Sequence, residues 1–498
     1  MSLNDVSYRL IFMTSPSTLT RSAEQLHTAV RWTRAQWLLL MVVCTVLALD
    51  GLDVSMVGVA LPSIGHELHL GTDSLQWIVS AYVLGYGSLL LLGGRLADLL
   101  GRRRIFLIAL TVFAAASLLG GLVNDPTLLI ATRFIKGLAA AFTAPTGFSI
   151  ITTNFAEGRE RNKALSIFTT FGASGFSLGL VVGGLMTSLS WRWTFLVSVP
   201  IAVAVVLLGM LFIPRDKPST EESGHDVWGA VTLALGMLGL VYTLVSAPQK
   251  GWGSVATIAG FAISAAVLAT FAVIENRVKH PLIRFGILRE GWVARANLSA
   301  IGLFGSYLSF QFILTMYLQS VLGWSPLGMA LALLPTGLLV ATSAPFADRF
   351  IEKFGAPKLI LTGLTSLGLG YVLFLRVGTS PNYVLDILPS VILLGIGFAL
   401  AFPSINVQAT AGIRDSEQGL AAGLIQTSTQ VGAALVLAVA TAIVSGHDAG
   451  TSSTLSAAAM LDQYRPGLVL SAAVAIAALL VAASPARRRR ALAEQPAA

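Results

Sequence analysis

The chain has 498 residues, of which 55% are hydrophobic and 11% are charged. Because about 25% of residues are charged in ordinary soluble domains, this composition excludes a soluble globular fold. The 48 glycines and 19 prolines fit a helical membrane protein, in which both are more common than in soluble helices. The single cysteine, Cys44, excludes an intrachain disulfide and a cysteine-based metal site. The net charge of +8 comes from basic residues interleaved with apolar stretches, which favours membrane topology over nucleic-acid binding.

Apolar stretches of about 17 residues or more predict helices that can cross a bilayer. We expect fourteen of them. In chain order they are Gln36 to Ala60, Ser74 to Gly93, Ile105 to Val123, Thr127 to Ile151, Leu165 to Leu185, Thr194 to Ile213, Val227 to Val245, Val255 to Glu275, Asn297 to Leu322, Leu327 to Phe346, Lys358 to Arg376, Tyr383 to Phe402, Gly419 to Val444 and Gly467 to Ala483.

The distribution of lysine and arginine predicts the orientation of these spans. With the N-terminus inside, 26 of the 32 basic residues fall in cytoplasmic segments, four fall in outer loops, and Arg133 and Lys136 lie within a span. Basic residues collect on the cytoplasmic side of membrane proteins. We therefore expect a multi-pass protein of the cell membrane with both termini in the cytoplasm.

Two charged linkers divide the chain. We expect a cytoplasmic tail over residues 1–34, a six-helix half over 35–213, a linker with two extra spans over 214–296, a second six-helix half over 297–484 and a basic cytoplasmic tail over 485–498. Two similar halves with an inserted pair are the layout of a duplicated transporter fold. A local repeat supports the duplication, because Asp98 precedes Gly101 by three residues after the second span, as Glu352 precedes Gly355 after the tenth.

Several motifs resemble those of the fourteen-helix drug:proton antiporter branch of the major facilitator superfamily. They are Leu52 to Pro62 in the first span, Gly94 to Arg103 in the first cytoplasmic loop, Arg133 to Gly137 in the fourth span, Gly175 to Gly184 in the fifth, Trp191 to Trp193, and Tyr317 to Pro326. The resemblance extends from about Gln36 to Ala483. It implies an all-α polytopic major facilitator fold of two six-helix halves plus two inserted helices, and a proton-coupled exporter of small lipophilic compounds that works by alternating access.

Four ionisable residues in the first and fourth spans are candidates for proton coupling. A charge at the bilayer centre costs at least about 2.5 to 3.5 kcal/mol, so such residues are expected to be functional. Asp50 and Asp53 share one helix face, and Arg133 and Lys136 share another. At about 1.5 Å per residue, Asp53 and Arg133 lie at similar depths, on the order of 10 Å, and Asp50 and Lys136 on the order of 14 Å.

The resemblance implies that Asp53 and Arg133 form the proton-coupling pair. Burial favours the protonated carboxyl whereas a nearby guanidinium favours the carboxylate, so small rearrangements can load or release a proton. The alternative is a static buried ion pair that orients the helices. By depth, Lys136 is expected to neutralise Asp50 or to contact an anionic group of the substrate.

Two further sets of residues are expected to act in conformational switching. A conformational latch is implied by resemblance, with Asp98 meeting basic residues and the start of the thirteenth helix near Gly419. Its members are Gly94, Asp98, Gly101, Arg102, Arg103, Glu352 and Gly355. A stripe of small residues lets neighbouring helices approach closely, for static packing or for gating. This stripe consists of Gly175, Gly179, Gly183 and Gly184.

Candidate substrate contacts are aromatic or neutral polar. Aromatic side chains favour lipophilic ligands over sugars or ions, although each could instead serve packing, and each polar side chain could instead bridge helices. The aromatic candidates are Trp77, Tyr82, Tyr307 and Phe310, and the polar ones are Gln311, Gln319, Asn406, Gln426 and Gln430. Asp386, near an outer end, is expected to be interfacial.

Other function classes find little support. The chain has no GxxxxGK[ST] phosphate loop, so an ion gradient is the expected energy source. His66 to His69 is one residue short of HExxH, and we expect no metal, no cofactor and no nucleic-acid partner. The expected partners are a small lipophilic substrate, protons and the lipid bilayer, and we expect a monomer. Export of an endogenous lipid or metabolite remains an alternative, and a polytopic membrane enzyme is disfavoured because no catalytic constellation is visible.

Overall fold

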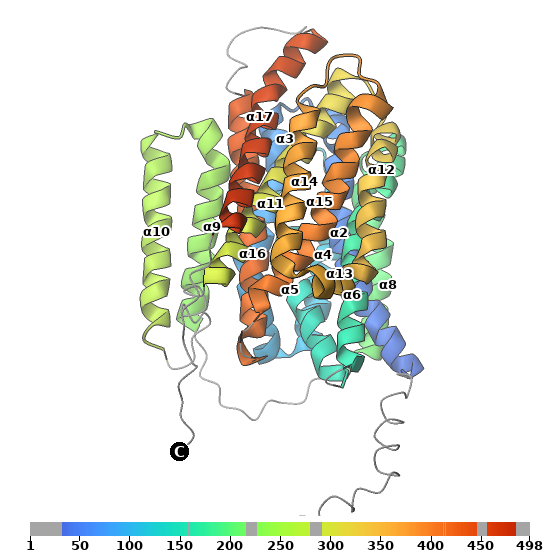
Figure 1. The fold of residues 1–498 in the computed structure, drawn as a ribbon. Coiled ribbons are helices and arrows are strands. Elements are labelled where there is room, and N and C mark those ends of the chain that lie inside the picture. The colour runs from blue at the N-terminus through green and yellow to red at the C-terminus, as the bar shows by residue number, and fades with distance from the viewer. Residues whose placement is uncertain are drawn as a thin grey trace, which may run out of the picture.

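The protein is a bundle of long helices, seen here in a computed structural model that describes residues 32–156, 159–215, 227–278, 291–411, 413, 415–445 and 456–484 (Figure 1). The first group of helices is α2 (Arg34–Leu68), α3 (Thr72–Leu100), α4 (Arg102–Leu122), α5 (Pro126–Asn154), α6 (Arg159–Leu189), α7 (Trp193–Leu196) and α8 (Ser198–Phe212). The pair α9 (Val227–Lys250) and α10 (Val255–Glu275) follows.

The second group begins with α11 (Gly291–Met316), which continues into the π-helical turn η2 (Tyr317–Val321). It goes on through α12 (Pro326–Ser343), the short 3-10 turn η3 (Ala344–Phe346), α13 (Ala347–Phe354), α14 (Ala356–Phe374), the π-helical turn η4 (Tyr383–Ile387), α15 (Leu388–Thr410), α16 (Asp415–Ser445) and α17 (Ala457–Ala483). Most of the predicted N-terminal tail and all of the predicted C-terminal tail lie outside the described residues.

Local sequence signals explain where several helices begin. Thr33 caps α2 in a capping box with Gln36, whose side chain accepts a hydrogen bond from the Thr33 backbone N–H. Asp125 caps α5 and Ser325 caps α12, each followed by a proline at the first helical position. Such caps satisfy backbone N–H groups that have no partner within the helix.

The predicted membrane-spanning architecture is confirmed. Thirteen helical segments of the described residues are long and apolar enough to cross a membrane, and α3, 29 residues long, lies at the place of the second predicted span. Several helices extend beyond the predicted apolar cores. For example, α2 continues to Leu68, so the HExxH-like stretch from His66 to His69 lies at the end of a helix.

The two groups of helices pack together most completely at one end of the bundle. We call the end where α2 begins the near end and the end where α2 finishes the far end. The core of the second group is continuous with the far-end core of the first group, whereas the near-end core of the first group forms a separate cluster. At the far end Gln319 donates a hydrogen bond to the Val59 carbonyl (2.8 Å), which joins η2 to α2.

The inserted pair lies beside the bundle. In Figure 1 α9 and α10 stand at one side, and α9 packs against α3 and α16. Val241 and Val245 of α9 share a buried cluster with Val83 and Leu84 of α3. This position leaves the space between the two groups of helices free of the inserted pair.

Candidate functional site

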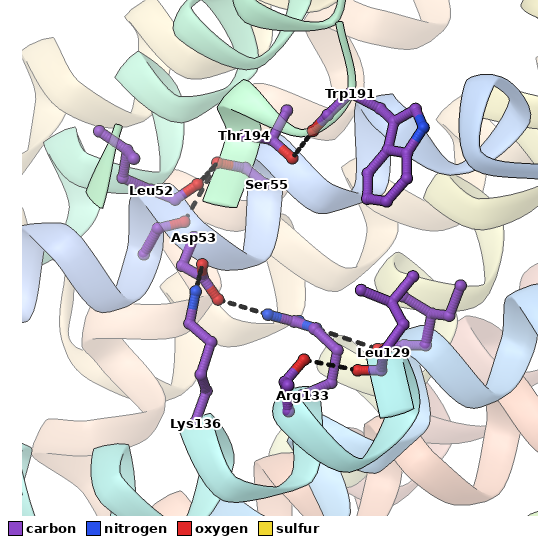
Figure 2. Close-up of polar contacts among 11 residues, drawn as sticks. Leu52, Asp53, Ser55, Leu129, Arg133, Lys136, Trp191 and Thr194 are labelled. Carbon is purple, nitrogen blue, oxygen red and sulfur yellow. Dashed lines mark hydrogen bonds and ion pairs between the residues drawn. The ribbon is translucent and has the colours of Figure 1, made fainter. Parts of the chain in front are cut away.

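A buried carboxylate with two cations lies between α2 and α5. The Asp53 carboxylate accepts a hydrogen bond from Arg133 Nη1 on one oxygen and from Lys136 Nζ on the other (Figure 2). Residues three apart in a helix share a face, so α5 presents both cations to the same carboxylate. The exposed fraction is 0% for Asp53, 1% for Arg133 and 0% for Lys136. These three residues form the ion cluster.

Neighbouring groups hold both cations in place. Arg133 Nε donates a hydrogen bond to the Ile78 carbonyl of α3 (3.0 Å), and its guanidinium lies over the Tyr82 ring, 4.6 Å from the centroid. The Lys136 ammonium lies 4.6 Å from the centroid of the Phe113 ring. Aromatic faces attract cations, and that attraction grows when water is excluded. The ion cluster therefore ties together α2, α3, α4 and α5.

The cluster differs from the sequence prediction in one pairing. Matching depths suggested that Lys136 faces Asp50, but its ammonium bonds to Asp53. Asp50 instead lies 3.3 Å from the Thr143 hydroxyl of α5 and has an exposed fraction of 6%. Lysine carries its charge on a flexible four-carbon stem, so the depth of its Cα fixes the position of the ammonium poorly.

The glycine stripe of α6 packs against α2 and α12. A Cβ on Gly175 would lie 2.2 Å from the Ala48 carbonyl oxygen, and one on Gly179 would lie 2.0 Å from Ser55 Oγ. A Cβ on Gly184 would lie 2.7 Å from the Ala330 Cβ of α12. Gly183 is similarly close to α2. These glycines permit backbone approaches that any side chain would block.

A small apolar cavity lies at the centre of the bundle. It is lined by Val54, Gly58 and Leu61 of α2, Val79 of α3, Phe176 of α6, and Leu308, Gln311, Phe312 and Thr315 of α11. Gln311 Oε1 and Thr315 Oγ1 are buried and have no hydrogen-bond partner among the described residues. The cavity therefore combines an apolar wall with two polar groups available for a ligand.

The other predicted substrate contacts are scattered. Trp77 faces the inserted pair, with its ring centroid 6.0 Å from that of Tyr242. Phe310 is 1% exposed and packs on Tyr371 inside the second group of helices, and Tyr82 lies under Arg133. None of these three side chains lines the cavity in this structure, and their role as substrate contacts stays a prediction.

The polar candidates take different positions. Gln430 contacts α3 next to Gly87, and Gln426 is exposed. Gln319 and Asn406 donate hydrogen bonds to backbone carbonyls, of Val59 and Phe402 respectively. Both amides therefore already have a partner. Asp386 is exposed at η4, as expected for an interfacial residue, and its carboxylate accepts a hydrogen bond from the Asn382 N–H (2.8 Å).

An aromatic group continues from the cavity around the predicted candidate Tyr307, together with phenylalanines that the sequence did not single out. Tyr307 of α11 lies 6.1 Å from Phe176 and 5.1 Å from Phe398 of α15, centroid to centroid. Phe304 and Phe402 extend the group, and all four phenylalanines are only partly buried. A three- to four-residue spacing on α11 and α15 is the signal that could have indicated them.

The predicted latch is only partly visible. Gly101 (φ 99°) and Gly355 (φ 82°) both adopt a backbone conformation that favours glycine, at equivalent helix junctions of the two halves. Arg103 donates a hydrogen bond to the Met210 carbonyl, and Glu352 is exposed. The side chains of Gly94 and Asp98, and those around Gly419, lie outside the described residues.

A polar network at the far end was also missed. The Glu67 carboxylate at the end of α2 accepts hydrogen bonds from Trp191 Nε1 (2.7 Å) and Arg192 Nη1. Arg192 also donates to Asn124, before α5. The motif Trp191 to Trp193, noted only as a sequence match, thus joins three loops of the first group.

Comparison with known proteins identifies the family. A family model described as the Major Facilitator Superfamily matches residues 43–437. The chain belongs to the Major Facilitator Superfamily. This facilitator is 35% identical over 458 residues to the puromycin resistance protein pur8 of Streptomyces alboniger, with 90% of each chain covered. It is 35% identical to the cephamycin export protein CmcT of Amycolatopsis lactamdurans, covering 84% of this chain and 87% of that one.

Solved structures show the same fold. The POT family transporter PepTSo matches with a TM-score of 0.66 at 17% sequence identity, and the match covers 91% of this facilitator and 98% of that chain. The nucleoside transporter NupG matches with a TM-score of 0.63 at 14% sequence identity. This match covers 90% of this facilitator and 100% of the NupG chain. As a member of this family the chain is a membrane transporter and not an enzyme.

Proposed function

We propose that this chain is a proton-coupled antiporter that exports small lipophilic, antibiotic-like compounds from the cell. The observation that supports this most strongly is the ion cluster, a carboxylate and two cations enclosed between α2 and α5. Buried ionisable groups in transporters are expensive and mark ion pathways. The similarity to puromycin resistance and cephamycin export proteins supports antibiotics as the substrate class.

The cavity supports a lipophilic substrate. Its wall is mostly aliphatic and aromatic, and Gln311 and Thr315 offer a few polar atoms. An apolar wall with a few polar atoms is the lining expected of a site for lipophilic compounds, and this small cavity would have to widen to hold one. The neighbouring Tyr307 and Phe398 rings extend the apolar surface toward the near end.

The proton gradient supplies enough energy for export. One proton that moves across 100 mV releases about 2.3 kcal/mol, which supports a substrate gradient of roughly fifty-fold. We expect one chain to contain the whole machine, since both halves of the duplicated fold are present. The transporter would therefore work as a monomer in the lipid bilayer.

The arrangement of the two cores favours a state open toward the cytoplasm. With the near end and both termini in the cytoplasm, as the basic residues favour, the shared far-end core closes the outer side. The separate near-end core leaves the two halves free to part on the cytoplasmic side. In alternating access the far end would open and the near end would close. The α6 glycines would let α2 and α12 slide against α6 during this change.

The proposal is tested with inside-out membrane vesicles that contain the full chain and an imposed pH gradient, acidic inside. We expect radiolabelled puromycin to accumulate in these vesicles and the accumulation to collapse when a protonophore is added. Lincomycin serves as a second probe, because a lincomycin resistance protein is also related to this chain. Failure of both probes to accumulate under a verified pH gradient would refute the proposal for this substrate class.

The variant Asp53→Asn tests the role of the cluster. Since the amide cannot balance the charges of Arg133 and Lys136, this variant is expected to lose proton-driven accumulation while puromycin binding stays detectable. Active accumulation at the wild-type level in Asp53→Asn vesicles would contradict the role of Asp53 in coupling.

A further inference from the structure

The two carboxyls on the same face of α2 have different surroundings. Asp53 is 0% exposed, and each of its oxygens accepts a hydrogen bond from a cation. Asp50 is one turn closer to the near end, is 6% exposed, and has a neutral hydroxyl as its hydrogen-bond partner. We propose that Asp50 and Thr143 form the proton-exchanging site of this transporter and that Asp53 remains a permanent anion. This inference rests on the proposed function.

The hydrogen bonds of Thr143 favour a protonated Asp50. The Thr143 hydroxyl lies 3.1 Å from the Ala140 carbonyl and 3.3 Å from Asp50 Oδ2. A hydroxyl has one hydrogen and two lone pairs, so it donates one full, two-centre hydrogen bond at a time. Both contacts are full hydrogen bonds when Thr143 donates to Ala140 and a protonated Asp50 donates to Thr143, whereas an ionised Asp50 has to share the Thr143 hydrogen with the Ala140 carbonyl.

When Asp50 releases its proton, the Thr143 hydroxyl can turn so that its hydrogen keeps an acceptor. The Asp50 O–H bond breaks and the proton passes to a water molecule that reaches Asp50 from the near end. The Thr143 O–H turns from the Ala140 carbonyl to the new carboxylate, so no hydroxyl hydrogen is left without an acceptor. Proton binding reverses both steps, and Thr143 therefore serves both states of the carboxyl.

Asp53 is unsuited to this exchange. Protonation there would remove the shared counter-ion of Arg133 and Lys136 and leave two buried cations side by side. Removing one partner of a buried ion pair is strongly unfavourable because the remaining charge is uncompensated. The aromatic contacts of Arg133 and Lys136 also fix both cations around Asp53.

Asp50 is better placed to meet water and substrate. It precedes Val54 by four residues, so both lie on the same face of α2, and Val54 lines the central cavity. The buried Tyr82 hydroxyl has no hydrogen-bond partner among the described residues and lies within electrostatic range of both carboxyls. This hydroxyl is an unused donor beside the proposed site.

The charged and titratable groups around Asp50 are few. They are Asp53 on α2, Tyr82 and Tyr86 on α3, and Lys136 and Arg133 on α5, of which Arg133 is bonded to Asp53. The other helices that pack on α2 add little, since α7, α8 and α12 have no charged residue, α6 has charged residues only in its first five positions, and α11 has only Arg295.

Protonation of Asp50 changes the net charge of this region. With all four groups ionised, Asp50 and Asp53 balance Arg133 and Lys136. A proton on Asp50 leaves an excess of one positive charge in the bundle. Because a buried net charge is costly, the two protonation states favour different arrangements of the helices. Proton occupancy is thereby linked to the conformational equilibrium.

Infrared difference spectroscopy of the reconstituted full chain tests the site without any substrate. On acidification we expect the carbonyl band of a newly protonated buried carboxyl in the wild type, and loss of this band in Asp50→Asn. The double variant Asp53→Asn/Lys136→Gln removes one anion and one cation, which keeps the charge balanced, and should retain the band. Persistence of the band in Asp50→Asn, or its loss in the double variant, would overturn the proposal.

Transport of puromycin by proteoliposomes gives a second readout. In Asp50→Asn we expect at least a tenfold loss of uphill accumulation, and residual downhill exit that no longer varies with pH. Asp50→Glu should keep the pH dependence. Thr143→Val should lose several-fold in uphill accumulation, whereas Thr143→Ser and the exposed control Thr111→Val should not.

Wild-type-like, pH-dependent transport in Asp50→Asn would refute the proposal and leave proton-coupled export intact. Absence of proton-driven transport in the wild type would refute the proposed function instead.

Discussion

The two cations of the ion cluster, Arg133 and Lys136, have different contacts, so the cost of removing one of them depends on its surroundings. Arg133 and Lys136 share one anion, but Arg133 also bonds to the Ile78 carbonyl, whereas Lys136 contacts Asp53 and two aromatic rings. Removing Lys136 leaves Asp53 paired with Arg133 and creates an excess of negative charge whenever Asp50 is ionised. The cost of this change therefore depends on the charge of Asp50.

Lys136→Gln is expected to destabilise the folded protein by about 3 kcal/mol, in the range for breaking one partner of a buried ion pair. The double variant Lys136→Gln/Asp50→Asn restores charge balance and should recover most of this loss. Thermal unfolding of the purified variants in lipid nanodiscs measures the effect. Additive effects of the two single changes would show that the two residues are not coupled.

The sequence predicted the residues of the cluster but not their pairing. Charges in apolar spans are conspicuous, and the spacing of Asp50 and Asp53 fixes them on one helix face. Which cation meets which anion depends on the crossing of α2 and α5 and on side-chain reach. Thr143, a neutral residue in an apolar span, gave no signal at all.

At the scale of helices, close approach sets the shape of the bundle. The α6 glycines bring α6 against α2 at one face and against α12 at another. Fourteen spans and the stripe itself were predictable from apolar length and small-residue spacing. The ends of the helices and the aromatic side chains around Tyr307 could not be predicted in this way. They depend on packing between segments that are distant in the sequence.

Gly179→Ala is expected to destabilise the protein by about 1 to 3 kcal/mol, because the new methyl group would overlap Ser55 and Leu52 of α2. Gly368→Ala in α14 is a matched control, since its nearest neighbour would lie 4.0 Å away. Heat-induced loss of the monodisperse peak in size-exclusion chromatography compares the two. Equal stability of the two variants would contradict close packing at Gly179.

At the scale of the whole molecule, the closed far end defines the conformational state. Gln319 bonds to the Val59 carbonyl and Ser177 to the Gly337 carbonyl, each across the two halves. Gly184 meets Ala330 farther toward the far end. Transport by alternating access requires these contacts to open in every cycle.

A cross-link between positions 184 and 330 tests this requirement. In a Cys44→Ala background, Gly184→Cys with Ala330→Cys places Cβ atoms about as close as a disulfide needs after a small separation of the helices. Oxidation should reduce puromycin accumulation at least tenfold, and reductant should restore it. Single-cysteine variants are the controls. Full transport by the oxidised, cross-linked chain would show that this end does not open.

The coupling of proton and substrate movement is tested most directly in proteoliposomes that enclose a pH-sensitive dye and have no imposed pH gradient. We predict that an inward puromycin gradient drives protons out of wild-type vesicles, raises the internal pH, and leaves the internal pH of Asp53→Asn vesicles unchanged. Puromycin entry through the wild-type protein without any proton movement would contradict the account.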